Sequence, residues 1–123
     1  MTQRLVDYKF FCFDGRVEFM FIAQGRGKDL RFDFFDRYFR PLDVENGVKK
    51  ADKLPEKPNN YDYMICIVEK LAKNINNVRV DLYNISGKIY FSEMTFYHNG
   101  GMVCFEPYWM DKMLGEYFIK KNI

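Results

Sequence analysis

The first two apolar segments of the chain are separated by a short polar pair. Tyr8–Phe13 and Arg16–Ala23 are rich in phenylalanine, valine and isoleucine, and Asp14-Gly15 lies between them. An Asp-Gly pair between two apolar runs is typical of a tight β-hairpin. We therefore predict two antiparallel strands joined at this pair.

The next segments alternate between polar and aromatic character. Gln24–Asp29 is polar and glycine-rich, which indicates a loop, whereas the aromatic residues of Arg31–Phe39 fit neither a helical nor a strand period. We favour a third strand there, because aromatic residues dominate and no helix cap precedes them. Asp43–Asn60 has almost no apolar residues, so we expect an exposed excursion that is the most mobile internal segment.

Asn60–Ile75 has the clearest helical pattern. Its apolar residues recur three and four positions apart and form one stripe: Met64, Ile67, Val68, Leu71, Ala72 and Ile75. Asn59 or Asn60 can cap the start, and Asp62 lies in the first turn, where a negative charge is favourable. The tail Glu106–Lys121 predicts a second helix that packs on the sheet.

A second hairpin follows the first helix. Val78–Tyr83 and Lys88–Tyr97 predict two strands, and alternation places Val78, Val80 and Leu82 on the core face and Arg79, Asp81 and Tyr83 on the opposite face. With these elements, we predict an α+β fold: a mainly antiparallel sheet with two helices on one face. A length of 123 residues suits a single domain.

The turn of this hairpin decides which face Glu93 occupies. A three-residue loop, Ile85–Gly87, would pair Asp81 with Phe91 and Arg79 with Glu93, so that Glu93 would lie on the face of Asp81. A two-residue Ser86-Gly87 turn would shift the register and send Glu93 to the other face. We expect the three-residue loop, with both carboxylates close enough to share a cation.

Composition narrows the classes of function. The net charge is only +2, and a protein that binds nucleic acid through its phosphates normally has a clear basic excess, so we expect no nucleic-acid partner. The sequence has no long apolar run and no signal pattern at its start, so we expect no membrane span and a cytoplasmic location, or at most a peripheral one at a membrane. Cys12, Cys66 and Cys104 are isolated and lie in apolar surroundings, which predicts buried free thiols; a catalytic pair of Cys104 with His98 is the alternative.

The polar face of the second hairpin is the candidate site. Mg²⁺ prefers one or two carboxylates plus phosphate oxygens, and arginine binds phosphate through two parallel hydrogen bonds. Asp81 and Glu93 beside Arg79 therefore suit a magnesium–phosphate site. The alternative is a cross-strand ion pair on a solvated face, which would contribute little.

The same residues support a family resemblance. The run Val78–Asn84 followed by Gly87–Phe96 resembles the C-terminal signature of ATP-grasp enzymes, in which an Arg-x-Asp strand precedes Glu-x-Asn or Glu-x-Thr and a glycine-containing loop such as Gly100-Gly101. Asp7–Gly15 resembles the strand that leaves the adenine hinge, and Trp109–Gly115 resembles the closing helix. The resemblance is closest to the TupA-like branch, which is associated with teichuronopeptide and other cell-surface polysaccharide biosynthesis.

The resemblance implies roles for individual residues. Asp81 and Glu93 would be Mg²⁺ ligands that bridge the phosphates of ATP, and Arg79 would neutralise the γ-phosphate or an acyl phosphate. Thr95 stands where many relatives have an asparagine ligand, and Lys9 and Arg31 would point toward the same cleft. The chemistry implied is activation of a carboxylate as an acyl phosphate, followed by attack of an amine, with a small carboxylate or sugar-linked acceptor as substrate.

The resemblance also implies that residues 1–123 correspond to the C-terminal subdomain only. The lysines and glycine-rich loop that cover the phosphates, and the adenine hinge, would then precede Met1 or come from a partner or a second copy of the chain. Gly25–Lys28 does not replace them, because it lacks the spacing of a phosphate-binding loop. A non-catalytic binding or assembly module, with a dimer formed through exposed aromatic residues, and a glycosyltransferase accessory protein are the alternatives.

Overall fold

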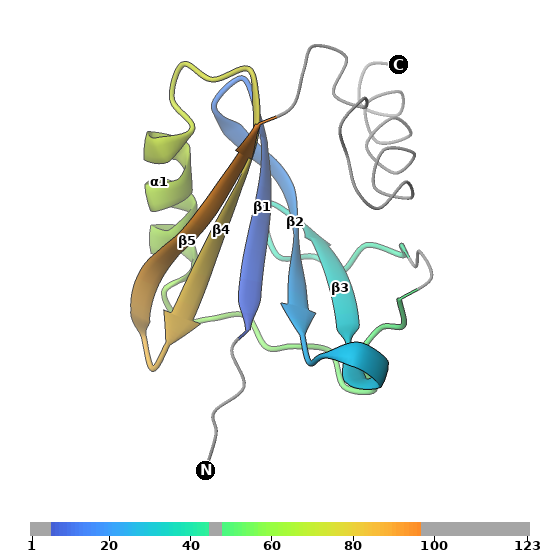
Figure 1. The fold of residues 1–123 in the computed structure, drawn as a ribbon. Helices are drawn as coiled ribbons and strands as arrows, with labels where there is room; N and C mark the ends of the chain where they lie inside the picture. The colour runs from blue at the N-terminus through green and yellow to red at the C-terminus, as the bar shows by residue number, and fades with distance from the viewer. Residues whose placement is uncertain (1–5, 45–47, 97–123) are drawn as a thin grey trace.

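The computed structural model of the chain describes residues 6–44 and 48–96 (Figure 1). This part contains five strands, one α-helix and one short 3-10 turn: β1 (Asp7–Phe13), β2 (Arg16–Gln24), η1 (Gly27–Asp29), β3 (Arg31–Asp36), α1 (Tyr61–Leu71), β4 (Asn77–Ile85) and β5 (Lys88–Phe96). In these ranges no helix is long and apolar enough to span a bilayer. The helix predicted at Glu106–Lys121, like the pair of Cys104 and His98, lies outside the described residues.

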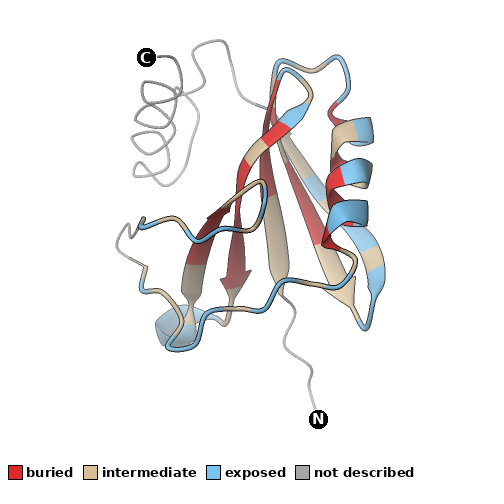
Figure 2. Cartoon of the chain, turned by 180° about the vertical axis from the view of Figure 1, so that it is seen from behind, coloured by how far each residue is buried: buried red, intermediate tan, exposed pale blue. Residues whose placement is uncertain are grey.

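The five strands form one antiparallel sheet in the order β3-β2-β1-β4-β5. Helix α1 covers one face of this sheet, and the strands and the inner side of the helix are buried against each other (Figure 2). The largest side chains of this core include Phe10, Phe35, Tyr61, Met64 and Leu82. Within the described residues the fold is therefore mainly β, an antiparallel sheet with one helix on one face.

The opposite face of the sheet has two halves. Aromatic residues on β1, β2 and β3 form a second buried cluster: Phe11, Phe13, Phe19, Phe21 and Phe34, with Ala23. Phe11 stacks on Phe19 with ring centroids 4.5 Å apart. The other half of this face, on β1, β4 and β5, carries the charged residues of the candidate site.

The first hairpin has the turn that the sequence predicts. Asp14 and Gly15 both have a positive φ, 52° and 78°, as a two-residue turn with this handedness requires. The predicted third strand is also confirmed, although it ends at Asp36 rather than at Phe39. The chain turns directly after the strand: the backbone N–H of Phe39 donates to the carbonyl of Asp36 at 3.0 Å, and Phe39 has a φ of 67°.

Helix α1 is shorter than predicted and is rotated about its axis. It ends at Leu71 rather than at Ile75, because the chain turns through Asn74, whose φ is 65°. The buried positions within it are Tyr61, Met64, Ile65 and Val68, whereas Leu71 is 39% exposed. The prediction that all cysteines are buried is wrong for Cys66, which lies on the exposed side of α1.

The excursion between β3 and α1 follows the outer edge of the sheet. Phe32 donates its backbone N–H to the carbonyl of Lys49 at 3.1 Å, and Leu42 donates to Phe34 at 2.8 Å. The backbone N–H of Ala51 donates to the buried carboxylate of Asp33 at 3.3 Å. These bonds cover the β3 edge, which would otherwise expose unpaired backbone groups.

The second hairpin differs from its prediction in two ways that compensate for each other. Its turn is the two-residue pair Ser86-Gly87, with Ile85 opposite Lys88. A bulge then shifts the register between Asp81 and Leu82, so that β5 has one extra residue at this point, Ser92. The predicted pairing of Asp81 with Phe91 is therefore wrong: Asp81 lies opposite Glu93, and Arg79 lies opposite Thr95.

Candidate functional site

One row of charged residues crosses three neighbouring strands. Lys9 of β1 lies opposite Asp81 of β4, and Asp81 lies opposite Glu93 of β5. Asp81 alternates with Val80 and Leu82, which belong to the core beneath α1, so the row lies on the helix-free face. Directly opposed residues have Cβ atoms about 4.5–5.5 Å apart, so the two carboxylates are neighbours. The sequence prediction that they share a face is confirmed.

Asp81 is the centre of this row. Its side chain is only 2% exposed, and both of its oxygens accept charged hydrogen bonds. Lys9 donates from Nζ to Oδ2 at 2.8 Å, and Arg79 donates from Nε to Oδ1 at 2.8 Å and from an Nη atom to Oδ2 at 2.9 Å. A buried carboxylate needs such partners, because an unpaired charge in this position would be strongly destabilising.

Glu93 and Thr95 form the outer part of the site. Both lie on β5, two residues apart, and the Thr95 hydroxyl donates to Glu93 Oε1 at 3.2 Å. Glu93 is exposed, in contrast to Asp81. The site therefore has one buried carboxylate held by two cations and one exposed carboxylate beside it.

Asp7 belongs to the same cluster, although the sequence analysis does not single it out. It lies two residues before Lys9 on β1, and its Oδ2 is 3.8 Å from Lys9 Nζ. Burial raises the pKa of Asp7; the charges of Asp81 and Glu93 also raise it, while those of Lys9 and Arg79 lower it. The alternation of β1 is the signal that could have identified Asp7, since it places Asp7 and Lys9 on the same face.

Arg31 is the one candidate residue that the structure does not bring to this cluster. Its guanidinium donates to the carbonyl oxygens of Lys28 and Leu30, at 2.9 and 2.7 Å. On β3 it alternates with Phe32 and therefore lies on the face of Phe35, beneath α1. Lys9, Arg79, Asp81, Glu93 and Thr95 are brought together without it.

The aromatic half of the face borders the charged row. Phe21 of β2 lies opposite Lys9, and Phe11 of β1 lies opposite Arg79. Both rings are almost completely buried. The cations and carboxylates therefore have an apolar wall on one side, which strengthens the interactions between charges relative to open water.

The residues present suit a magnesium ion that is completed by a ligand. Asp81 and Glu93 supply hard carboxylate oxygens from adjacent strands, and Mg²⁺ is commonly bound by one or two carboxylates plus substrate phosphates. In 6–44 and 48–96, no group of three or more histidine, cysteine, aspartate or glutamate residues is arranged to hold a metal ion. Two carboxylates would leave most coordination positions of Mg²⁺ to water or to oxygens of a ligand.

Comparison with known proteins defines the class of protein that has this sheet and cluster. The sequence model of the family described as TupA-like ATPgrasp matches residues 1–119, nearly the whole chain. The protein is thus an ATP-grasp protein. It belongs to the TupA-like family of that class. Searches of curated proteins and of solved structures found no significant match.

Proposed function

We propose that the chain supplies the magnesium–phosphate wall of an ATP-dependent, carboxylate-activating ligase that acts in cell-surface polysaccharide biosynthesis. The observation that carries the proposal is the row of Lys9, Asp81 and Glu93, with Arg79 bound to Asp81 through two hydrogen bonds. Membership of the TupA-like ATP-grasp family supports ATP as the nucleotide. We propose a cytoplasmic location, because the reaction consumes ATP and ATP is supplied there.

The side chains have distinct roles in this proposal. Asp81 and Glu93 would hold the magnesium ion, which neutralises charge on the transferred phosphoryl group when it is bound. Arg79 orients Asp81 and presents its remaining N–H groups to phosphate oxygens, and Lys9 adds a second positive charge from β1. Thr95 fixes Glu93 by donating to its carboxylate. Catalysis at such a site depends on position and charge rather than on a covalent step by the protein.

The acceptor would approach the open side of this row, beyond Glu93 on β5, the outer strand of the described sheet. The carboxylate to be activated needs cations to offset its own charge beside the phosphates, and Lys9 and Arg79 supply them. The second wall of the cleft, which covers the adenine and phosphates, would come from sequence outside residues 1–123 or from a partner. We therefore propose a half-site that works only when this wall is present.

The proposed site is tested by mapping where Mg·ATP binds on the 123-residue chain. Backbone NMR shifts on addition of millimolar Mg·ATP are expected to centre on Lys9, Arg79 and Glu93 and to disappear when magnesium is chelated. Asp81→Asn should remove these shifts, whereas Asp52→Asn, which changes an exposed loop carboxylate, should leave them unchanged. Shifts that centre elsewhere, or that survive Asp81→Asn, would contradict the proposal.

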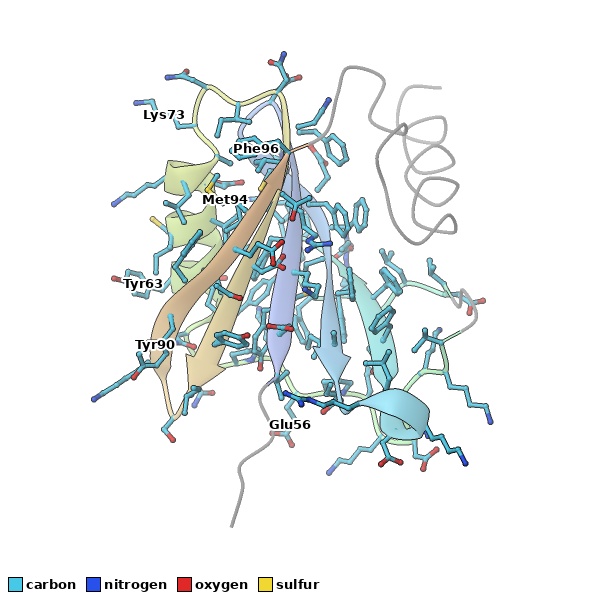
Figure 3. All side chains as sticks on the ribbon, in the orientation of Figure 1. Glu56, Tyr63, Lys73, Tyr90, Met94 and Phe96 are labelled. Atoms are coloured by element: carbon cyan, nitrogen blue, oxygen red, sulfur yellow. The ribbon has the colours of Figure 1, made fainter. Side chains whose placement is uncertain are left out.

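An assembly module is the second candidate, because β5 exposes several large aromatic side chains. Tyr90, Phe91 and Phe96 are 47%, 57% and 61% exposed, and β5 is the outer strand of the described sheet. Tyr90 lies near the turn end of the strand and Phe96 at its other end (Figure 3). Sedimentation of the chain would show self-association that Phe91→Ser weakens if this candidate is right.

A further inference from the structure

The two cations that hold Asp81 are attached in different ways. Arg79 is two residues away on the same strand and binds both carboxylate oxygens through a planar, rigid fork. Lys9 comes from the neighbouring strand and binds one oxygen through a single ammonium group on a flexible stem. Of the two, Lys9 is therefore the contact that can be exchanged with little rearrangement.

Lys9 also has a second carboxylate within reach. Its Nζ is 2.8 Å from Asp81 Oδ2 and 3.8 Å from Asp7 Oδ2. Asp7 Oδ1 is buried and has no hydrogen-bond partner within the described part of the chain. Asp7 is therefore short of donors, and an ammonium group that leaves Asp81 has an anionic group beside it to accept it.

The contact between Lys9 and Asp81 affects how strongly the cluster attracts a divalent cation. By formal charge, Asp7, Asp81 and Glu93 contribute three negative charges and Lys9 and Arg79 two positive charges, which gives the cluster a formal charge of −1. Without Lys9 the same cluster would be at −2 and would attract a bare divalent cation much more strongly. Bound phosphate groups add negative charge and so restore the attraction for the cation that Lys9 reduces.

We propose that Lys9 is a displaceable counter-ion that suppresses binding of a bare divalent cation at Asp81 and Glu93 and so makes metal binding depend on phosphate. Asp7 is the second anchor that receives Lys9 when it leaves Asp81. This inference rests on the proposed function, because it takes Asp81 and Glu93 as the metal ligands. Lys9 is a positioning residue here, and its effect appears in the metal affinity itself.

The test measures binding of Mn²⁺ to the 123-residue chain by electron paramagnetic resonance, first alone and then with ADP. Lys9→Met removes the charge but keeps the length of the side chain, and should tighten binding of Mn²⁺ alone by on the order of tenfold or more. Lys9→Arg keeps the charge and should therefore keep binding of Mn²⁺ alone as weak as in the wild type. Lys73→Met, which removes a charge beyond the end of α1 (Figure 3), is the matched control and should change nothing.

ADP supplies the second half of the test. It should tighten Mn²⁺ binding strongly in the wild type and much less in Lys9→Met, whose metal affinity no longer depends on phosphate. Asp7→Asn removes the second anchor and should weaken binding of Mn²⁺ with ADP. Lys9→Gln repeats the charge removal, and circular dichroism and urea unfolding establish that each variant is folded.

The outcomes separate this inference from the proposed function. If Glu93→Gln and Asp81→Asn abolish Mn²⁺ binding but Lys9→Met and Lys9→Gln leave it at the wild-type affinity, the counter-ion role is overturned and the metal site stands. If Mn²⁺ binding does not respond to either carboxylate variant, the proposed function itself fails. The counter-ion role is supported only if Lys9→Met and Lys9→Gln both bind Mn²⁺ more tightly than the wild type.

Discussion

Glu93 lies directly opposite Asp81 on the neighbouring strand, although the turn that joins the two strands is one residue shorter than the sequence predicts. The bulge at Ser92 restores the match by adding one residue to β5. The pair brings together carboxylates of opposite character: one is buried and held by Lys9 and Arg79, and the other is exposed.

The 123-residue chain should bind Mg·ATP weakly, with a dissociation constant in the millimolar range or above. Such a constant corresponds to a binding free energy of no more than about 4 kcal/mol. The described residues supply carboxylates and cations for the phosphates on one wall only, and water weakens each charge contact at an open wall. Titration calorimetry measures this constant directly. Micromolar binding that disappears in Asp81→Asn would show that the chain, alone or as an oligomer, has a complete nucleotide site.

Glu69 should contribute measurably to stability, because it joins the helix to the sheet. Its Oε2 accepts from the backbone N–H of Val17 at 2.9 Å and from Arg37 at 2.7 Å. Glu69→Ala should lower the free energy of unfolding by about 1.5–3 kcal/mol, the range for hydrogen bonds to charged groups. Urea unfolding at pH 7 measures the loss, and Cys66→Ala, on the exposed side of the same helix, is the control.

The contribution of Glu69 should also depend on pH. Burial disfavours its ionised form, but the hydrogen bonds from Arg37 and Val17 outweigh burial and lower the pKa of Glu69 below its usual 4.5. A depressed carboxyl pKa stabilises the fold above the unfolded pKa, and this stabilisation is lost as the pH falls through the folded pKa. The difference in unfolding free energy between wild type and Glu69→Gln should therefore shrink below pH 4.5. A difference that stays constant down to acid pH would contradict this assignment.

Two glycines in the loop before β3 should differ in their tolerance of alanine. Gly25 and Gly27 both have a positive φ, so each substitution costs about 1–2 kcal/mol for the left-handed backbone alone. A Cβ at Gly25 would lie 2.1 Å from the backbone oxygen of Asp29, whereas a Cβ at Gly27 meets nothing within 4 Å. Gly25→Ala should therefore lower the midpoint of urea unfolding clearly more than Gly27→Ala. Equal losses would show that the loop rearranges freely.

The thiols of Cys12 and Cys66 should react at very different rates. Cys12 is completely buried, and burial raises its pKa to about 12, whereas Cys66 is exposed on α1. Thiolate is the reactive form, so Cys12 should be unreactive near neutral pH. In a Cys104→Ser background, Ellman's reagent should label one thiol rapidly, and Cys66→Ser should remove this fast phase. Loss of the fast phase in Cys12→Ser instead would contradict the fold around β1.

The two hairpins and the presence of α1 follow from the sequence, because local patterns decide them, whereas the pairing of β1 with β4 does not. The Asp14-Gly15 turn and the alternation of Val78–Tyr83 are visible in any reading of the chain. The helix boundary at Leu71 is less accessible, since apolar residues continue to Ile75 and only the backbone turn at Asn74 ends the helix. A pattern of hydrophobic residues does not indicate where a non-glycine residue adopts a left-handed backbone conformation.

The composition of the charged cluster is only partly accessible from sequence. Alternation predicts that Arg79 and Asp81 share a face, and the structure brings Glu93, Thr95 and Lys9 to it. The placement of Lys9 depends on the pairing of β1 with β4, two strands far apart in the sequence. Arg31, in contrast, is expected at the cluster but lies outside it. The expectation comes from family resemblance, whereas the guanidinium binds carbonyl oxygens of the neighbouring loop on the other face.

The bulge at Ser92 has a consequence for how the second hairpin tolerates insertions and deletions. Loss of Ser92 would leave Phe91 opposite Leu82 and Glu93 opposite Asp81 in an unbroken ladder, so a single deletion there preserves the facing carboxylates. Loss of a residue between Glu93 and Phe96 has no such compensation and would move Thr95 away from Arg79. The hairpin can therefore lose one residue on the turn side of its carboxylate pair without changing that pairing. We expect natural variants that differ in hairpin length by one residue to differ on this side.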